Sequence, residues 1–152
     1  MTKQRPVQHL EITTFVHSTE DKVKVVKAVS NLFPEDIEVP PYEEVKLAGV
    51  FGDQLSILKW VITNRRPATE VVNKVIKEMA SIDHMELLES LDSRIDENKN
   101  MYIRLDKQKA FSRVMKIEKH DPVRLKARLL VPHKADPVKI MYDHIQELTQ
   151  DA

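Results

Sequence analysis

The sequence predicts an α+β fold, a mostly antiparallel sheet of about five to six strands with helices packed on one face. Segments in which apolar and polar residues alternate indicate half-buried strands, and apolar residues spaced three or four apart indicate amphipathic helices. These segments follow one another as strand, helix, two strands, helices, three strands and helix, an order that favours helices on one side of a sheet. With 152 residues, 41% of them hydrophobic, we expect one domain spanning residues 1–152.

The first strand is predicted over residues 9–17, where alternate side chains are apolar. The sequence Ser-Thr-Glu-Asp at 18–21 supplies an N-cap and first-turn acids for a helix over 19–33. Pro34 ends this helix, because the residue before a proline is disfavoured in the helical region. A proline-rich, acidic surface loop follows.

Two strands at 43–50 and 55–63 form a predicted hairpin, with residues 52–54 as its turn and Gly49 as a bulge or close backbone approach. A helix is expected to begin near Pro67, after an exposed Arg65-Arg66 pair, and a second over 83–96 with Met85 among its inward residues. The remaining elements are strands at 100–106, 113–119 and 123–131, a short helix at 107–111, and a helix at 137–149 capped by Asp136.

The composition excludes several classes of function. The absence of cysteine removes disulfides, thiolate zinc sites and cysteine nucleophiles. Two glycines are too few for a glycine-rich phosphate cradle, which argues against ATPases and dinucleotide enzymes. The first seven residues lack an apolar core, and no apolar run approaches the length of a membrane span. We therefore expect a soluble cytoplasmic protein with no membrane partner.

The charge is unevenly distributed although the formal net charge is zero. Residues 99–134 contain eleven Lys and Arg but three acids, while residues 77–98 contain two Lys and Arg and seven acids. Strand alternation sharpens this asymmetry, because Arg104, Lys116, Arg124, Lys126 and Arg128 all fall on the polar phase of their predicted strands. If these strands are neighbours, the sheet has one open cationic face suited to phosphates.

A second basic feature follows the strand at 100–106. Asp106 is placed to cap the short helix, whose predicted exposed positions are Lys107, Gln108 and Lys109. Lysines at a helix start oppose its dipole, and a bound phosphate would remove that cost. The alternative is that Asp106 already offsets it.

Three segments resemble an archaeal family of RNA-binding proteins and predicted exosome subunits: residues 11–23 (EITTFVHSTEDKV), 49–52 (GVFG) and 102–110 (YIRLDKQKA). The resemblance covers most of the chain and implies a fold similar to the ribosomal protein that binds 5S rRNA. Two strand-to-helix corners of the family match positions in this sequence, and the resemblance implies no catalytic residue. The chain departs from the family pattern in its acidic loop at 35–44 and in Arg65-Arg66. The corners consist of His17, Thr19, Glu20 and Asp21, and of Arg104, Asp106, Lys107 and Gln108.

Two polar clusters have a structural and a functional interpretation. His17 with residues 18–21 resembles a metal or acid/base cluster, but helix capping accounts for it better because no further ligand converges by spacing. The acids between Asp83 and Asp92 imitate paired catalytic carboxylates, but they are typical of a solvated helix face. The phase of Trp60 leaves open whether it packs or stacks on a ligand, and Phe51 most simply packs.

We therefore predict a non-catalytic protein without cofactor or metal that binds structured RNA, with partners in the exosome or ribosome and a role in RNA processing. The alternative is a protein–protein adaptor or homodimeric scaffold. A hydrolase is disfavoured, because the sequence contains no recognisable nucleophile. The predicted RNA contacts are Arg65, Arg66, Tyr102, Arg104, Lys107, Gln108, Lys109, Lys116, Arg124, Lys126 and Arg128.

Overall fold

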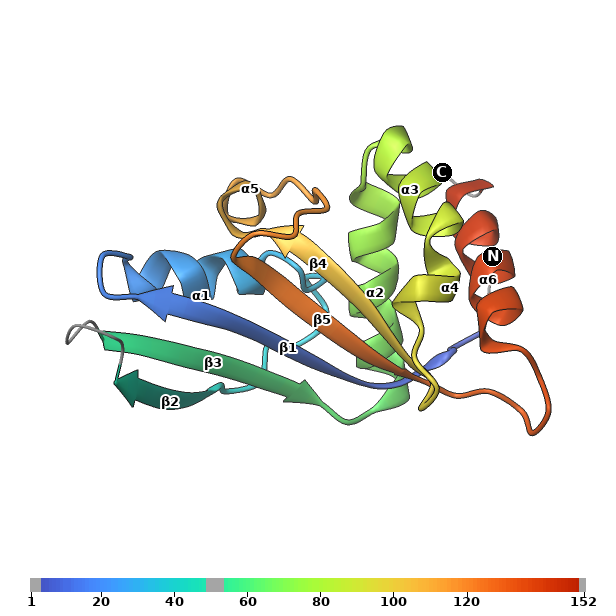
Figure 1. The fold of residues 1–152 in the computed structure, drawn as a ribbon, viewed down its shortest axis with the longest axis horizontal. Coiled ribbons are helices and arrows are strands. Elements are labelled where there is room, and N and C mark those ends of the chain that lie inside the picture. Colours follow the sequence, from blue (N-terminus) through green and yellow to red (C-terminus); the bar gives the residue numbers. More distant parts are fainter. Residues whose placement is uncertain (1–3, 49–53, 151–152) are drawn as a thin grey trace.

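The computed structural model describes residues 4–48 and 54–150, and this part of the chain forms five strands and six helices (Figure 1). The strands are β1 (Val7–His17), β2 (Glu43–Ala48), β3 (Gln54–Ile62), β4 (Asn100–Asp106) and β5 (Pro122–Leu129). The helices are α1 (Lys22–Ser30), α2 (Arg65–Glu78), α3 (Ser81–Glu89), α4 (Leu91–Arg94), α5 (Lys107–Phe111) and α6 (Pro137–Gln150).

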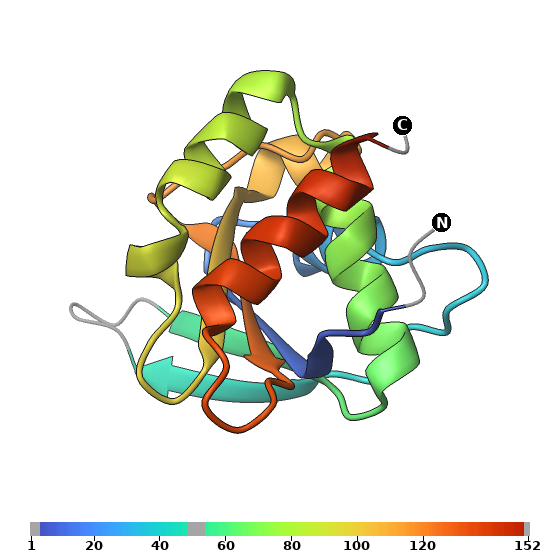
Figure 2. The same ribbon diagram turned by 90° about the vertical axis from the view of Figure 1, so that its right-hand side faces the viewer.

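The strands form one antiparallel sheet in the order β2-β3-β1-β5-β4. The longest strand, β1, lies at its centre, and the helices gather on one side of it (Figures 1 and 2). Helix α2 packs against β1, and α6 packs against α2 and α4. The predicted α+β fold class is confirmed. In the described part of the chain, every helix is too short or too polar to cross a membrane.

The core lies between the sheet and the helices. Alternate side chains of β1, β4 and β5 are buried, including Ile12, Ile103 and Leu125, as expected for strands with one wet face. The predicted apolar stripe of α2 is also buried. Trp60 is 1% exposed, with its ring 5.2 Å from that of Tyr42, so it packs in the core.

The predicted helix caps at Asp106 and Asp136 are confirmed, and the cap expected within residues 18–21 is Asp21. The carboxylates of Asp21, Asp106 and Asp136 accept hydrogen bonds from the amides of Val23 (3.0 Å), Lys109 (2.8 Å) and Val138 (3.0 Å). Helix α1 therefore begins after Asp21, later than predicted. Helix α2 begins before Pro67 and contains Arg65 and Arg66 in its first turn. The predicted features at Gly49, Phe51 and most of the 52–54 turn lie outside the described residues.

Two predictions about secondary structure are wrong. Residues 113–119 form isolated bridges, Met115 with Met79 and Ile117 with Leu105, because the segment crosses from the end of α2 to the edge of β4. A left-handed Arg113 (φ 63°) also interrupts extended backbone there. The helix expected over 83–96 breaks at Ser90 into α3 and α4. Within α3 the buried residues are Asp83 and Leu87, so Met85 points outward and is 61% exposed, against the predicted inward position.

Candidate nucleic-acid interface

The face of the sheet that the helices leave open carries a group of cations. Arg104 of β4 lies opposite Arg124 of β5, and Tyr102 lies opposite Lys126. Directly opposed residues of antiparallel strands project from the same face, and all four are half-buried between fully buried neighbours. Arg104, Arg124 and Lys126 therefore share one surface, as their strand phase predicts. We call these three residues the cationic cluster.

Tyr102 holds the two arginines of the cluster in place. The guanidinium groups of Arg104 and Arg124 each lie 5.7 Å from the centre of its ring, a cation–π distance. The Tyr102 hydroxyl donates a hydrogen bond to Asp96 (3.0 Å). Burial and this hydrogen bond raise the pKa of Tyr102, so the hydroxyl remains a donor. The ring is occupied by the arginines, so Tyr102 positions them, and its predicted contact with RNA stays a prediction.

The cationic cluster has no acidic partner among the described residues, since Arg104, Arg124 and Lys126 form no ion pair there. Glu11 lies on the same face, but its carboxylate pairs with Lys59 of β3 at 3.5 Å. The Nε of Arg124 is buried without a hydrogen-bond acceptor. The positive charge of the cluster is therefore not neutralised by an acid of the described chain and is available to an anionic ligand.

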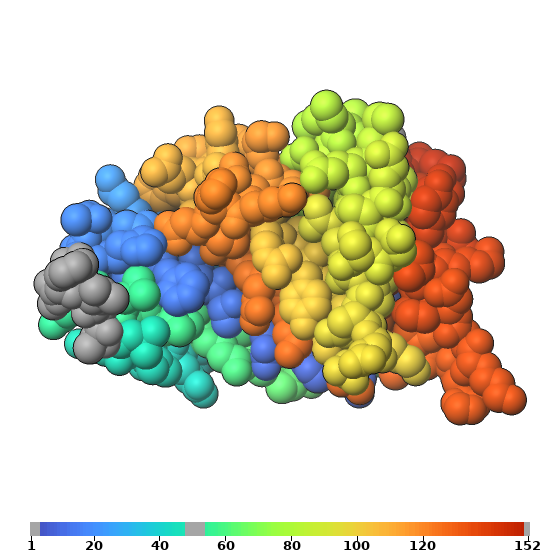
Figure 3. Space-filling model, viewed as in Figure 1, coloured from blue at the N-terminus to red at the C-terminus, as the bar shows by residue number. Residues whose placement is uncertain are grey.

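A hollow of about 430 Å³ opens beside the cluster on this face. Figure 3 looks onto the open side of the sheet, where strand side chains are exposed and α2 is hidden. Phe15 of β1 is 40% exposed on this side and lines the hollow. The hollow is lined by Thr13, Thr14, Phe15, Ile57, Arg104, Lys119, Pro122 and Arg124.

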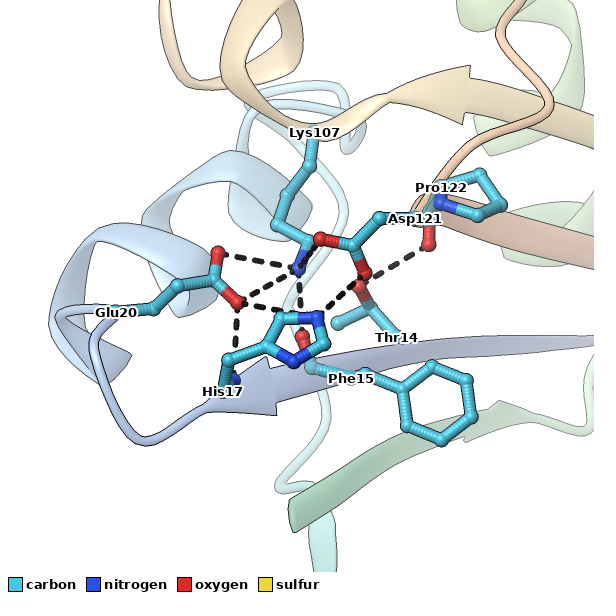
Figure 4. A network of polar contacts seen from close by, with 7 residues as sticks. All are labelled: Thr14, Phe15, His17, Glu20, Lys107, Asp121 and Pro122. Carbon is cyan, nitrogen blue, oxygen red and sulfur yellow. Dashed lines mark hydrogen bonds and ion pairs between the residues drawn. The ribbon is translucent and has the colours of Figure 1, made fainter. Parts of the chain in front are cut away.

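Lys107, expected to be exposed at the start of α5, is 6% exposed. Figure 4 shows its side chain pointing between Glu20 and Asp121. The Nζ atom lies 3.0 Å from a carboxylate oxygen of each and donates to the Phe15 carbonyl oxygen at 2.7 Å. The prediction that Lys107 is exposed is wrong, because tertiary contacts bring two distant acids to it. A role for Lys107 in binding RNA stays a prediction.

His17 completes this arrangement, with its Nε2 3.1 Å from Asp121. One ligand atom from each of His17, Glu20 and Asp121 lies within 4.8 Å of the others, so the structure supplies the third donor that sequence spacing did not reveal. The Lys107 ammonium already provides the positive charge between the two carboxylates. Burial pushes the pKa of Asp121 up, but hydrogen bonds from Lys107 and His17 together lower it below its ordinary value. We call these four residues the lysine network.

The lysine network joins three segments that are far apart in the sequence. It connects the end of β1, the start of α5 and the residue before β5, and Thr14 adds a hydrogen bond from its hydroxyl to the Pro122 carbonyl oxygen (3.2 Å). Asp121 adopts a left-handed backbone conformation (φ 45°), which aspartate tolerates better than most residues. The network is therefore a structural connection at the edge of the open face.

The other predicted contacts lie in different places. Arg128 is exposed and follows the same alternation on β5, and Gln108 and Lys109 are exposed on α5. Lys116 lies outside any strand and pairs with the buried Asp83 of α3 at 3.8 Å, so it does not join the cluster as predicted.

The two arginines of α2 are separate from the open face. Arg65 donates to the Arg5 carbonyl oxygen at 2.9 Å, and Arg66 pairs with Asp36 at 2.9 Å. Both belong to a helix on the covered side of the sheet. Their contact with RNA stays a prediction.

Two residues of the open face, Phe15 and Lys119, are not among the residues predicted from the sequence to bind RNA. Phe15 lies on the polar phase of the first predicted strand, and an aromatic residue there was the available signal. Lys119 was counted in the basic segment, but no strand phase placed it beside Arg104. It follows the irregular segment after α5, and tertiary structure alone brings it to the hollow.

Residues 9–129 match the model of a family described as RNA binding. The chain is 30% identical over 141 residues to the RNA-binding protein PAB1135 of Pyrococcus abyssi, a match that covers 91% of this chain and 90% of that protein. Among solved structures it is similar to AF2318 from Archaeglobus fulgidus, with a TM-score of 0.75 and 29% identity over 93% of this chain and 99% of that one. It is also similar to the DUF54 protein Mth689 from Methanothermobacter thermautotrophicus, with a TM-score of 0.73 and 25% identity over 95% of this chain and 98% of that one.

Proposed function

The chain belongs to this RNA-binding family, and we propose that it holds structured RNA through the open face of its sheet without catalysing a reaction on it. The cationic cluster contacts phosphates and ribose hydroxyls, and Arg128, Gln108 and Lys109 extend the contact at its margins. The observation that supports this most directly is a set of three aligned cations with no acidic partner in the described part of the chain.

The energetics favour an anionic partner at this surface. A cation already paired with a carboxylate must give up that pair to bind a phosphate, whereas the cluster gives up only solvent. Because the chain has no net charge, attraction of RNA depends on this local surface. Phosphate contacts of this kind position RNA and make its affinity depend on salt.

We place this activity in archaeal RNA processing, with components of the exosome or ribosome as partners. The support is the family resemblance and the name of PAB1135 as an RNA-binding protein.

The alternative is a protein adaptor or homodimer that does not touch RNA. One observation favours it: the edge strand β2 exposes Val45 (55%) and Leu47 (38%) next to an unpaired backbone edge. Sedimentation at several concentrations tests this alternative. A stable dimer that fails to shift RNA would replace the proposed function.

The proposed function is tested by gel shift with a structured RNA at several salt concentrations. Arg104→Ala with Arg124→Ala should weaken binding by roughly 10- to 100-fold and make the dependence of affinity on salt shallower by about two phosphate contacts. Arg65→Ala with Arg66→Ala removes the same charge from the covered side of the sheet, and it should leave binding unchanged if the interface is confined to the open face. Equal losses in both double variants would contradict an interface on the open face.

A further inference from the structure

The hollow beside the cationic cluster has two chemically different sides. Phe15, Ile57 and Pro122 form an apolar side, and Arg104, Arg124 and Lys119 form a cationic side. Among its described lining residues there is no carboxylate. A ligand that fits must therefore carry an anionic group next to a flat apolar group.

The arrangement of these sides follows from strand register. Phe15 lies opposite Ile57, and the next residue on the same face of β1, Thr13, lies opposite Arg124, which lies opposite Arg104. The apolar and cationic side chains thus occupy adjacent rows of one rigid sheet. A ligand can span both rows without any rearrangement of the backbone.

Tyr102 is not available as the apolar side, because both guanidinium groups already lie over its ring. Phe15 lines the hollow, its side chain is 40% exposed, and no aromatic ring contact involves it among the described residues. Its ring points away from the lysine network (Figure 4). Arg124 and Arg104 line the same hollow and form no ion pair with the described residues. Phe15 is therefore available for stacking with a base, and the neighbouring arginines are available to bind a phosphate.

We infer that this hollow receives one unpaired nucleotide of a structured RNA, with its base against Phe15 and its phosphate between Arg104, Arg124 and Lys119. The inference rests on the proposed function and adds which part of the RNA is recognised. A volume of about 430 Å³ lies within the range of pockets that hold small ligands, roughly 300–1,000 Å³. Bases in bulges and loops can leave the stack and pack on aromatic side chains, which a continuous duplex does not allow.

The test compares three RNA hairpins of the same stem sequence: fully paired, with a single-nucleotide bulge, and with an abasic residue in that bulge. The wild-type protein should bind the bulged hairpin roughly five- to a hundredfold more tightly than the abasic one, the range measured for stacking of one base. This comparison uses only wild-type protein. Equal affinity for the bulged and abasic hairpins would overturn the inference.

Phe15→Ala should abolish the preference for the bulged over the abasic hairpin while leaving the affinity for the paired hairpin unchanged. Val61→Ala is the matched control, because Val61 is 39% exposed on the same face but does not line the hollow. An equal loss of preference in both variants would overturn the role of Phe15. Thermal melting of both variants checks that they fold.

Adenosine monophosphate in the same assay separates RNA from a free nucleotide. It should compete with the bulged hairpin at least a hundredfold more weakly than unlabelled hairpin, because it lacks the phosphates that contact Lys126 and Arg128. Competition at equal concentration would overturn the assignment to RNA. If none of the three hairpins binds, the proposed function fails as well. If all bind equally, only the unpaired-nucleotide inference fails.

Discussion

Arg104 and Lys107 lie three residues apart in the sequence and have opposite electrostatic surroundings. Arg104, in the cationic cluster, contacts the Tyr102 ring and forms no ion pair with the described residues. Lys107, in the lysine network, is buried between Glu20 and Asp121. Both contribute equally to the basic charge of residues 99–134. The comparison shows that a count of charges does not identify which cations are available to bind RNA.

The difference comes from the acids that tertiary structure brings to each cation. Glu20 lies in the turn between β1 and α1, and Asp121 directly precedes β5. Their carboxylates enclose the Lys107 ammonium (Figure 4). On the open face, the carboxylate of Glu11 already forms an ion pair with Lys59. The lysine network should therefore contribute mainly to stability, and the cationic cluster mainly to binding.

The largest effect is expected for Lys107→Ala, which should lower the free energy of unfolding by about 2 kcal/mol. Removing one member of a buried ion pair costs about 3–5 kcal/mol, and the partial exposure of Glu20 and Asp121 reduces this value. Urea denaturation measures the change, with the exposed neighbour Lys109→Ala as the control, which should change stability by less than about 0.5 kcal/mol. A large loss of RNA affinity in folded Lys107→Ala would mean that this lysine binds RNA after all.

Tyr102→Leu should weaken RNA binding about fivefold, because the two arginines lose the ring that positions them, a contact worth about 1 kcal/mol. Tyr102→Phe keeps the ring and removes only the hydrogen bond to Asp96. It should retain wild-type RNA affinity and lose about 1 kcal/mol of stability. If both variants lose affinity equally, the ring does not act by positioning the arginines.

Stability should decrease in acid partly through Asp121. The pKa of Asp121 is lower in the folded chain than its ordinary value of 3.8, so the folded state favours the ionised carboxylate. Its contribution is present above pH 3.8 and is lost as the pH falls below that value toward the folded pKa. Urea midpoints measured from pH 6 to 3 should fall less steeply in Asp121→Asn. An unchanged slope would show that Asp121 is not stabilised by the lysine network.

The smallest effect is expected for Lys116→Ala, which should change RNA affinity by less than about twofold. Lys116 pairs with Asp83 of α3, so its charge is already engaged and it does not belong to the cationic cluster. Lys126→Ala removes an equal charge from the open face and should weaken binding several-fold more. Salt-dependent binding curves of the two variants make the comparison, and equal losses would place Lys116 in the interface.

The sequence alone predicted the fold class, the helix caps at Asp106 and Asp136, and, on the condition that their strands are neighbours, the common face of Arg104, Arg124 and Lys126. These features depend on short-range rules: side chains alternate along a strand, and a cap contacts amides two or three residues away. Once the apolar phase of β4 and β5 is assigned to the core, the orientation of their arginines follows. The pairing of β4 with β5 and the register that sets Arg104 opposite Arg124 came from the folded structure.

Tertiary structure alone decided which charges remain unpaired. The acids that enclose Lys107 come from positions 20 and 121, and the pair of Lys116 with Asp83 joins segments about thirty residues apart. The hollow likewise combines Phe15, Ile57 and Lys119 from three separate segments. Periodicity specifies the face on which a side chain lies but not the groups that the folded chain places against it. Coulomb and hydrogen-bond energies depend on those distances, so the availability of each cation was decided by the fold.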